Sequence, residues 1–278
     1  MAIQKTLLST LSQQREKNKR KTRPQVPLYP IVSEREYRRE LRELVRYTRM
    51  LIQTRLMPVL GETNREVNAE IRGDASIPDI NAIIDGIRFS VAMRYPANRR
   101  QEMALRAAFL ANASNRTQFE AKVLVPNNLP IPTAEPWLQP IMESYSYVNT
   151  RLIESIPDRY LDSVQNIVNE GVLGGVQTSE IRSQIRAEFG VSDRRAGVIA
   201  RDQIGKLNGQ LNRTRQEKAG FGKYRWQTSG DESVRATHAR QQGKIYSWDD
   251  PPSETGHPGE DYNCRCWAEP VFDEEVED

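Results

Sequence analysis

Hydrophobic residues recur at helical spacing over residues 33–58. We expect a helix to begin at Ser33, which stands three residues before Glu36 in the spacing of a capping box. It is predicted to end at Pro58, because proline has no backbone N–H to continue the hydrogen-bond ladder. The predicted buried face consists of Tyr37, Leu41, Leu44, Val45, Leu51, Ile52 and Leu56.

The next stretch, residues 62–122, predicts further helices with breaks near Gly73, Pro78 and Pro96. A proline-rich segment then covers residues 124–140, and its prolines are Pro126, Pro130, Pro132, Pro136 and Pro140. Proline fixes φ and lacks a donor, so this segment is predicted to be a linker and the main domain boundary.

Residues 141–221 return to helical spacing and predict four helices. The first carries an apolar face of Ile141, Tyr145, Val148 and Leu152. The second helix is predicted to end at Gly171. The third is predicted to begin at Thr178 and end before Gly190, and the fourth to begin at Ser192 and end at Gly220.

After Gly222 the period changes from that of a helix to that of a strand. The predicted strands contain Tyr224, Trp226 and Thr228 in the first, Lys244 to Trp248 in the second, and Cys264 to Phe272 in the third. Between the first two, Asp231 is expected to cap a short helix that carries Arg235 and His238 on one face.

Together these elements predict an α+β fold that is predominantly helical. A helical N-terminal region and a helical middle precede a small C-terminal domain with a short antiparallel or mixed sheet and one short helix. The predicted parts are a basic arm with prolines (1–32), a helical region (33–123), the linker (124–140), the helical part (141–221), the small α+β domain (222–272) and an acidic tail (273–278). No run of apolar residues reaches membrane-spanning length, and residues 1–14 do not have the form of a secretory signal.

Charge changes the picture, because the chain is polarised from end to end. Residues 1–60 hold 14 Lys and Arg against 5 acidic residues, a net +9, whereas residues 230–278 hold 4 against 13, a net −9. The basic residues of the arm that would bind nucleic acid or an acidic surface are Arg15, Lys17, Lys19, Arg20, Lys21 and Arg23. The alternative is that this run is a solvated tail.

Every His and Cys of the chain lies between residues 238 and 266. The four are His238, His257, Cys264 and Cys266, which is the ligand set of a closed tetrahedral zinc site. On a strand, Cys264 and Cys266 would point to the same side, so their sulfurs would converge on one structural ion. The alternative is two small buried thiols with two histidines that bond to the backbone.

A catalytic use of the same region is a third alternative. Arg235, His238 and His257 would supply a phosphate clamp and an acid/base pair for a phosphodiesterase or nuclease, provided that both imidazoles reach one phosphate. Trp226, Trp248 and Trp267 would form a stacking platform for bases, although such residues are more often the core of a small sheet.

The ordered set of residues in this region resembles the Mu F-type phage head morphogenesis proteins, also called minor head or minor capsid proteins. The motif residues are Trp226, Asp231, Arg235, His238, Gly243, His257, Pro258, Cys264, Arg265 and Cys266. Residues 199–208 are similar to the long helix that precedes the tryptophan strand in that family, so the resemblance covers about residues 140–272. The chain departs from the family pattern at one point. The family often places its second histidine directly before the Asn-Cys-Arg-Cys run, whereas here residues 259–262 separate His257-Pro258 from it.

The resemblance implies a structural protein of a tailed bacteriophage rather than an enzyme. Such a protein is made in the host cytoplasm and resides in the virion, in the head interior or at the portal. The implied partners are the portal protein and/or the major capsid protein, with scaffolding protein and packaged DNA as further ones, and no membrane. The N-terminal half lies outside the resemblance, so its basic arm and helices are interpreted from their residues alone.

Overall fold

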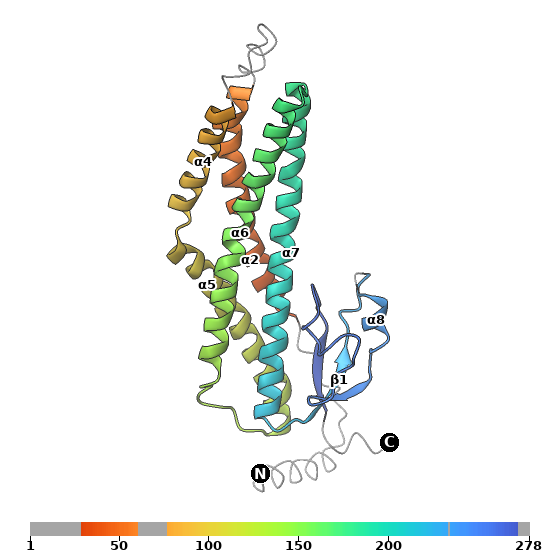
Figure 1. The fold of residues 1–278 in the computed structure, drawn as a ribbon. Coiled ribbons are helices and arrows are strands. Elements are labelled where there is room, and N and C mark those ends of the chain that lie inside the picture. Colours follow the sequence, from red (N-terminus) through yellow and green to blue (C-terminus); the bar gives the residue numbers. More distant parts are fainter. Residues whose placement is uncertain (1–28, 61–76, 233, 272–278) are drawn as a thin grey trace. The chain divides into compact units, whose positions relative to one another are not determined.

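The computed structural model describes residues 29–60, 77–232 and 234–271. This part of the chain is predominantly helical and carries one three-stranded antiparallel sheet near its C-terminal end, which confirms the predicted fold class (Figure 1). The basic residues Arg15 to Arg23, Gly73 and the acidic tail lie outside the described residues.

The helices and strands follow one another in a simple order along the chain (Figure 1). The helical elements are α2 (Ile31–Leu51), η1 (Ile52–Leu56), α4 (Ile77–Arg94), α5 (Ala97–Phe119), η2 (Glu120–Leu124), η3 (Val125–Asn127), α6 (Leu138–Leu173), α7 (Thr178–Lys218) and α8 (Ala236–Ala239). The strands are β1 (Lys223–Gln227), β2 (Ile245–Ser247) and β3 (Trp267–Val271), in the spatial order β2-β1-β3.

The chain divides into two compact units. Unit 1 comprises Met1–Glu34, Ala107–Met142 and Arg201–Asp278, and unit 2 comprises Arg35–Arg106 and Glu143–Ala200. Residues 124–140, predicted to be a linker, fall inside unit 1. They contain irregular backbone from residue 128 to residue 137, as expected from their prolines.

Unit 2 is a helical bundle built from parts of α2, α4, α6 and α7. The predicted face of α2 is confirmed, since all seven of its residues are buried. The Tyr37 hydroxyl donates to Asn149 Oδ1 of α6 over 2.9 Å, and Arg42 of α2 pairs with Asp193 of α7 at 2.9 Å. Arg88 of α4 pairs with a carboxylate of α6 in the same way. Burial of the apolar faces stabilises this bundle, and the polar pairs set which helix faces meet.

The limits of α2 differ from the prediction at both ends. The helix begins at Ile31, because the carbonyl of Pro30 accepts the first helical hydrogen bond, from Glu34 N at 3.1 Å. Ser33 is therefore buried inside the first turn instead of capping it. At the other end the backbone widens into the π-turn η1 and continues as helix through Pro58 to the end of the described segment. The widened turn lets the chain pass a residue that has no N–H to donate.

Helices α6 and α7 are each continuous, although the sequence predicted two separate helices in the place of each one. Helix α6 runs through Pro157, and the buried residues Ile153, Ile156 and Tyr160 on both sides of the proline offset its missing hydrogen bond. Helix α7 begins at Thr178, as predicted, and passes Gly190 and Ser192 without ending. Packing of the surrounding turns outweighs the weak helix preference of one glycine.

The predicted apolar face of α6 is confirmed at Tyr145 but is wrong at Val148. Val148 is 44% exposed, whereas Asn149 is fully buried. The amide of Asn149 is satisfied by the Tyr37 hydroxyl and by the carbonyl of Tyr145. Because a hydrogen-bonded amide is tolerated in the interior, hydrophobicity alone assigned the wrong side of this turn.

The other predicted helix boundaries are mixed. Pro96 separates α4 from α5 as predicted, but Pro78 is the second residue of α4 and helps to begin it. Gly220, with φ of 90°, follows the end of α7 as predicted. None of the helices in residues 29–60, 77–232 and 234–271 has the length and apolar character needed to cross a membrane.

The small sheet confirms the predicted strands, with different limits. Strand β1 pairs with β2 through Tyr224 and Tyr246, and with β3 over its whole length from Lys223–Val271 to Gln227–Trp267. Since β1 ends at Gln227, residues before Trp267 have no strand to pair with. Cys264 and Cys266 therefore precede β3 instead of lying in it, which corrects the predicted third strand.

Candidate metal centre

The segment that carries the cysteines rests directly on α7, because two glycines of that helix leave room for it. A Cβ at Gly205 would lie 2.5 Å from the Cys264 carbonyl oxygen, and one at Gly209 would lie 2.7 Å from the Pro258 carbonyl oxygen. Only glycine allows a helix and another backbone to approach so closely. The spacing of four residues puts both glycines on one face of the helix.

Polar groups of α7 fix the same segment and the strand that follows it. The Asn263 N–H donates to Asp202 Oδ1 over 2.7 Å, and Asn263 itself has a φ of 60°, in the left-handed region. Further along the helix, the amides of Asn212 and Gln216 both donate to the Ala268 carbonyl of β3, over 2.9 and 2.8 Å. Helix α7 thus holds the turn before the cysteines and the strand after them.

Substitution of Gly205 by alanine is expected to destabilise unit 1 by about 1–3 kcal/mol, because a backbone carbonyl must move to admit the methyl group. Gly190 is the matched control, since it lies in the same helix and a Cβ there would meet nothing within 4 Å. Gly190→Ala is expected to stabilise by about 0.5–1 kcal/mol. Urea unfolding of both variants measures the difference, and equal effects would contradict the tight approach.

Three of the four predicted metal ligands come together. His238 of α8, Cys264 and Cys266 are all buried, and their ligand atoms lie within 4.8 Å of one another. His238 Nδ1 is 3.4 Å from Cys266 Sγ and 3.5 Å from Cys264 Sγ. A hydrogen bond from Cys266 lowers the pKa of the Cys264 thiol below its ordinary value.

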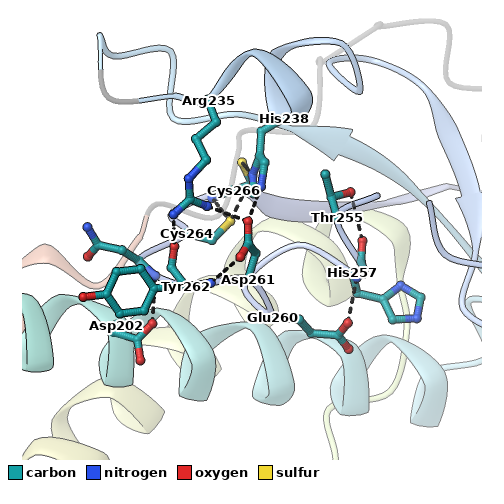
Figure 2. Close-up of polar contacts among 12 residues, drawn as sticks. Asp202, Arg235, His238, Thr255, His257, Glu260, Asp261, Tyr262, Cys264 and Cys266 are labelled. Atoms are coloured by element: carbon teal, nitrogen blue, oxygen red, sulfur yellow. Dashed lines mark hydrogen bonds and ion pairs between the residues drawn. The ribbon is translucent and has the colours of Figure 1, made fainter. Parts of the chain in front are cut away.

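Asp261 occupies the other side of the His238 ring (Figure 2). Its Oδ2 lies 2.9 Å from His238 Nε2 and also accepts from Arg235 Nη1 at 2.5 Å. Arg235 reaches on to the Tyr262 carbonyl. Burial raises the pKa of Asp261, but the hydrogen bond from His238 and the Arg235 charge outweigh it, so the pKa lies below its usual value.

Helix α8 is shorter than predicted and begins after Arg235, which is its N-cap residue, so Asp231 does not cap it. Asp231 instead pairs with Arg265 at 2.8 Å. Trp226 of β1 packs edge-on against the His238 ring, with centroids 5.6 Å apart. Trp226 on one side of His238, and Asp261 with its partner Arg235 on another, therefore hold the ring in place.

His257 lies elsewhere, which corrects its predicted place as a fourth ligand. Its Nδ1 is 2.9 Å from the Tyr224 hydroxyl, and its ring packs against Tyr224 and Trp248 with centroids 5.5 and 5.0 Å away. Burial lowers the pKa of its imidazole, although the negative charge of Glu260 acts in the opposite direction. The Glu260 carboxylate also accepts a hydrogen bond from the backbone N–H of His257. Figure 2 shows the His257 ring turned away from Asp261 and His238.

The same placement separates the residues of the catalytic alternative. Arg235 and His238 share Asp261, whereas His257 is buried among aromatic side chains and bonded to Tyr224. The two imidazoles do not face one common position, which the nuclease interpretation requires.

The tryptophans belong mainly to the core of the sheet. Trp226 and Trp248 are buried in one cluster with Tyr224, Ala268 and the two cysteines. Trp267, at the start of β3, is half-buried. The core interpretation is therefore confirmed for Trp226 and Trp248, which leaves no stacking platform for bases formed by the three rings.

Two acidic residues of the site were missed by sequence reasoning. Asp261 holds His238, and Asp202 holds the turn at Asn263. Asp261 lies three residues before Cys264, and this short spacing could have indicated it. Asp202 lies 61 residues before Asn263, the residue that it binds, so it gives no local signal.

Comparison with known proteins places this site in a family context. Residues 162–269 match the family described as “Phage Mu protein F like protein”. The matched segment begins in α6 and ends in β3, so it contains the glycines of α7 and every candidate ligand. The resemblance inferred from the motif is thus confirmed over this segment.

The chain is also similar to a bacterial protein over somewhat less than half of its length. An uncharacterized protein of Haemophilus influenzae is 44% identical over 125 residues. These residues make up 45% of this chain and 28% of that protein, so the chain spans little more than a quarter of the length of its relative. No solved structure matches the chain.

Proposed function

We propose that this protein is a minor head protein of a tailed bacteriophage that acts in head morphogenesis. The observation that carries the proposal is the match of residues 162–269 to the phage Mu protein F like family. Within that segment the motif residues have defined structural tasks, since Trp226, Asp231, Arg235, Arg265 and the cluster residues all bond or pack within one small domain. The proposal therefore rests on a connected set of residues.

In this proposal the protein is a structural component and not an enzyme. The polar groups that would serve catalysis are engaged with one another, as Arg235 is with Asp261 and His257 with Tyr224. Such bonds stabilise the fold and orient its surface for binding. The proposed partners are the portal protein and/or the major capsid protein, and the proposed location is the virion, in the head interior or at the portal.

Contact with scaffolding protein and packaged DNA belongs to the same proposal. It rests on the charge of the chain, whose first 60 residues carry a net +9. Binding of phosphates by Lys and Arg releases counterions, so DNA binding through the arm would weaken steeply with salt.

Purified phage particles test the proposal. A lysate from a phage that encodes the full chain is treated with nuclease, and heads, procapsids and free protein are separated on a density gradient. We expect the chain to sediment with procapsids and virions and to be recovered with portal or capsid protein after cross-linking. Recovery in the free fraction alone, with normal particles produced by a deletion mutant, would contradict the proposal.

A further inference from the structure

We propose that His238, Cys264 and Cys266 bind one Zn²⁺ ion that fastens the segment before β3 to α8. The inference does not depend on the proposed function, because it rests on side-chain geometry within unit 1. It also revises the ligand set that the sequence indicates, since His257 is not part of it.

The distances between the donor atoms are those of a tetrahedral zinc site. With Zn–S bonds of about 2.3 Å and a Zn–N bond of about 2.0 Å, the nitrogen-to-sulfur edges of a tetrahedron are about 3.5 Å long. The two distances from His238 Nδ1 to the sulfurs are 3.4 and 3.5 Å. Both nitrogen-to-sulfur edges therefore match those of a zinc tetrahedron, and the two sulfurs also lie within 4.8 Å of each other.

The hydrogen bonds of His238 leave the correct nitrogen for a metal. Asp261 lies 2.9 Å from Nε2 and, as a carboxylate, accepts a hydrogen bond from Nε2–H, so that in the neutral ring Nδ1 carries the lone pair. That lone pair points to two sulfurs at nearly equal distance, and a single hydrogen bond can serve only one of them well. A shared cation satisfies all three atoms, and a carboxylate behind the histidine is the usual second partner in zinc sites.

The charges of the group also balance when zinc is bound. Zn²⁺ displaces one proton from each thiol, the two protons go to solvent, and the ion with two thiolates is neutral. Beyond it, the negative Asp261 is paired with the positive Arg235. A buried cluster of zero net charge avoids the cost of an unpaired buried ion.

The chemistry of the ligands indicates which metal ion the site would bind. Two thiolates and one imidazole suit zinc, whereas calcium and magnesium require oxygen ligands. We assign the fourth position to a water molecule, because Asp261 is held by Arg235 and His238 and His257 by Tyr224. A water in the fourth position is more typical of catalytic zinc, but we assign this ion a structural role because the site joins α8 to the turn that rests on Gly205.

Elemental analysis of the untagged full chain tests the site directly. The protein is purified under reducing conditions, equilibrated with ZnCl₂ and freed of excess metal. We expect about one zinc per chain, lost in Cys264→Ser/Cys266→Ser and in His238→Ala. The matched control is His257→Phe, which alters the other histidine and is expected to keep its zinc.

Two measurements on the unaltered protein keep the test valid if a variant does not fold. Titration with Co²⁺ is expected to produce the near-ultraviolet absorption of thiolate-to-cobalt charge transfer. Zinc is also expected to protect Cys264 and Cys266 from alkylation, with protection lost on adding a chelator. Absence of zinc, of the cobalt band and of protection would overturn the proposal, and so would loss of zinc in His257→Phe.

The residue behind the histidine gives a graded result. Asp261→Asn keeps all three ligands but removes the carboxylate that orients the imidazole. We expect an unchanged stoichiometry with zinc affinity lowered about 10–100-fold. An affinity equal to that of the unaltered protein would contradict the orientation of His238 on which the assignment of Nδ1 rests.

Discussion

Replacement of Glu135 by alanine is expected to lower the free energy of unfolding by about 3–5 kcal/mol, because it leaves a buried arginine charge without its partner. Glu135 lies in the proline-rich segment and binds Arg215 of α7 through both carboxylate oxygens, at 2.8 Å each. The side chains are only 7% and 3% exposed.

Other groups around Arg215 depend on the same pair. Its guanidinium also donates to the side-chain oxygens of Asn115 and Asn112, and it lies 5.4 Å from the centre of the Trp137 ring. These neutral acceptors do not replace the lost negative charge. Residues 128–137 have no helix or strand of their own, so their attachment to α7 depends on side-chain contacts such as this one. The alanine variant therefore weakens that attachment.

Urea unfolding followed by tryptophan fluorescence measures the effect, and Arg240–Glu254 supplies a matched control. That pair has a similar length, 2.9 Å against 2.8 Å, but both side chains are 58% exposed. Glu254→Ala is expected to cost at most about 1 kcal/mol. The double variant Glu135→Leu/Arg215→Met is expected to recover much of the loss, since no charge is then left buried. A similar small effect for Glu135→Ala and Glu254→Ala would contradict this explanation.

Removal of zinc is expected to unfold the sheet region, residues 223–271, while the helical bundle of unit 2 keeps its structure. The sheet has a small core of Tyr224, Trp226, Trp248, Ala268 and the two cysteines. In so small a core, a metal ion supplies a large share of the folding free energy, so its loss is expected to cost several kcal/mol.

Hydrogen exchange of the full chain, with and without a chelator, localises the effect. Amides of β1 and β3 are expected to lose protection, whereas those of α4, which belongs to unit 2, are expected to keep theirs. Because Trp226 and Trp248 are buried in the same core, their fluorescence is expected to shift to longer wavelength. The Cys264→Ser/Cys266→Ser variant serves as the control that no longer responds to the chelator. Unchanged protection in β1 and β3 of the zinc-loaded protein would show that the ion does not stabilise the sheet.

The sequence predicted the local elements well where one period dominates. The buried face of α2, the strand around Trp226, the start of α7 at Thr178 and the turn at Gly220 all agree with the structure. These features depend on neighbours within a few residues, and the alternation of polar and apolar side chains records them directly.

Helix breaks were overpredicted for a physical reason. Pro157 and Gly190 each weaken a helix locally, but buried residues before and after them are held by other helices. The cost of one missing hydrogen bond or one flexible residue is smaller than the gain from continuing a packed face. Local preference alone therefore cannot tell a helix end from a tolerated interruption.

The sequence by itself determined that His and Cys are confined to one short region, and it indicated the zinc chemistry that we propose for that region. Only the tertiary structure decided which of the four residues meet. His238 and His257 are the same residue type in the same region of the chain, and only their hydrogen-bond partners distinguish them. Asp261 takes the first, and Tyr224, 33 residues earlier, takes the second. The structure likewise decided that the proline-rich segment belongs to unit 1, through Glu135 and an arginine 80 residues away. Such pairings follow from the three-dimensional approach of distant segments, which a pattern along the chain does not record.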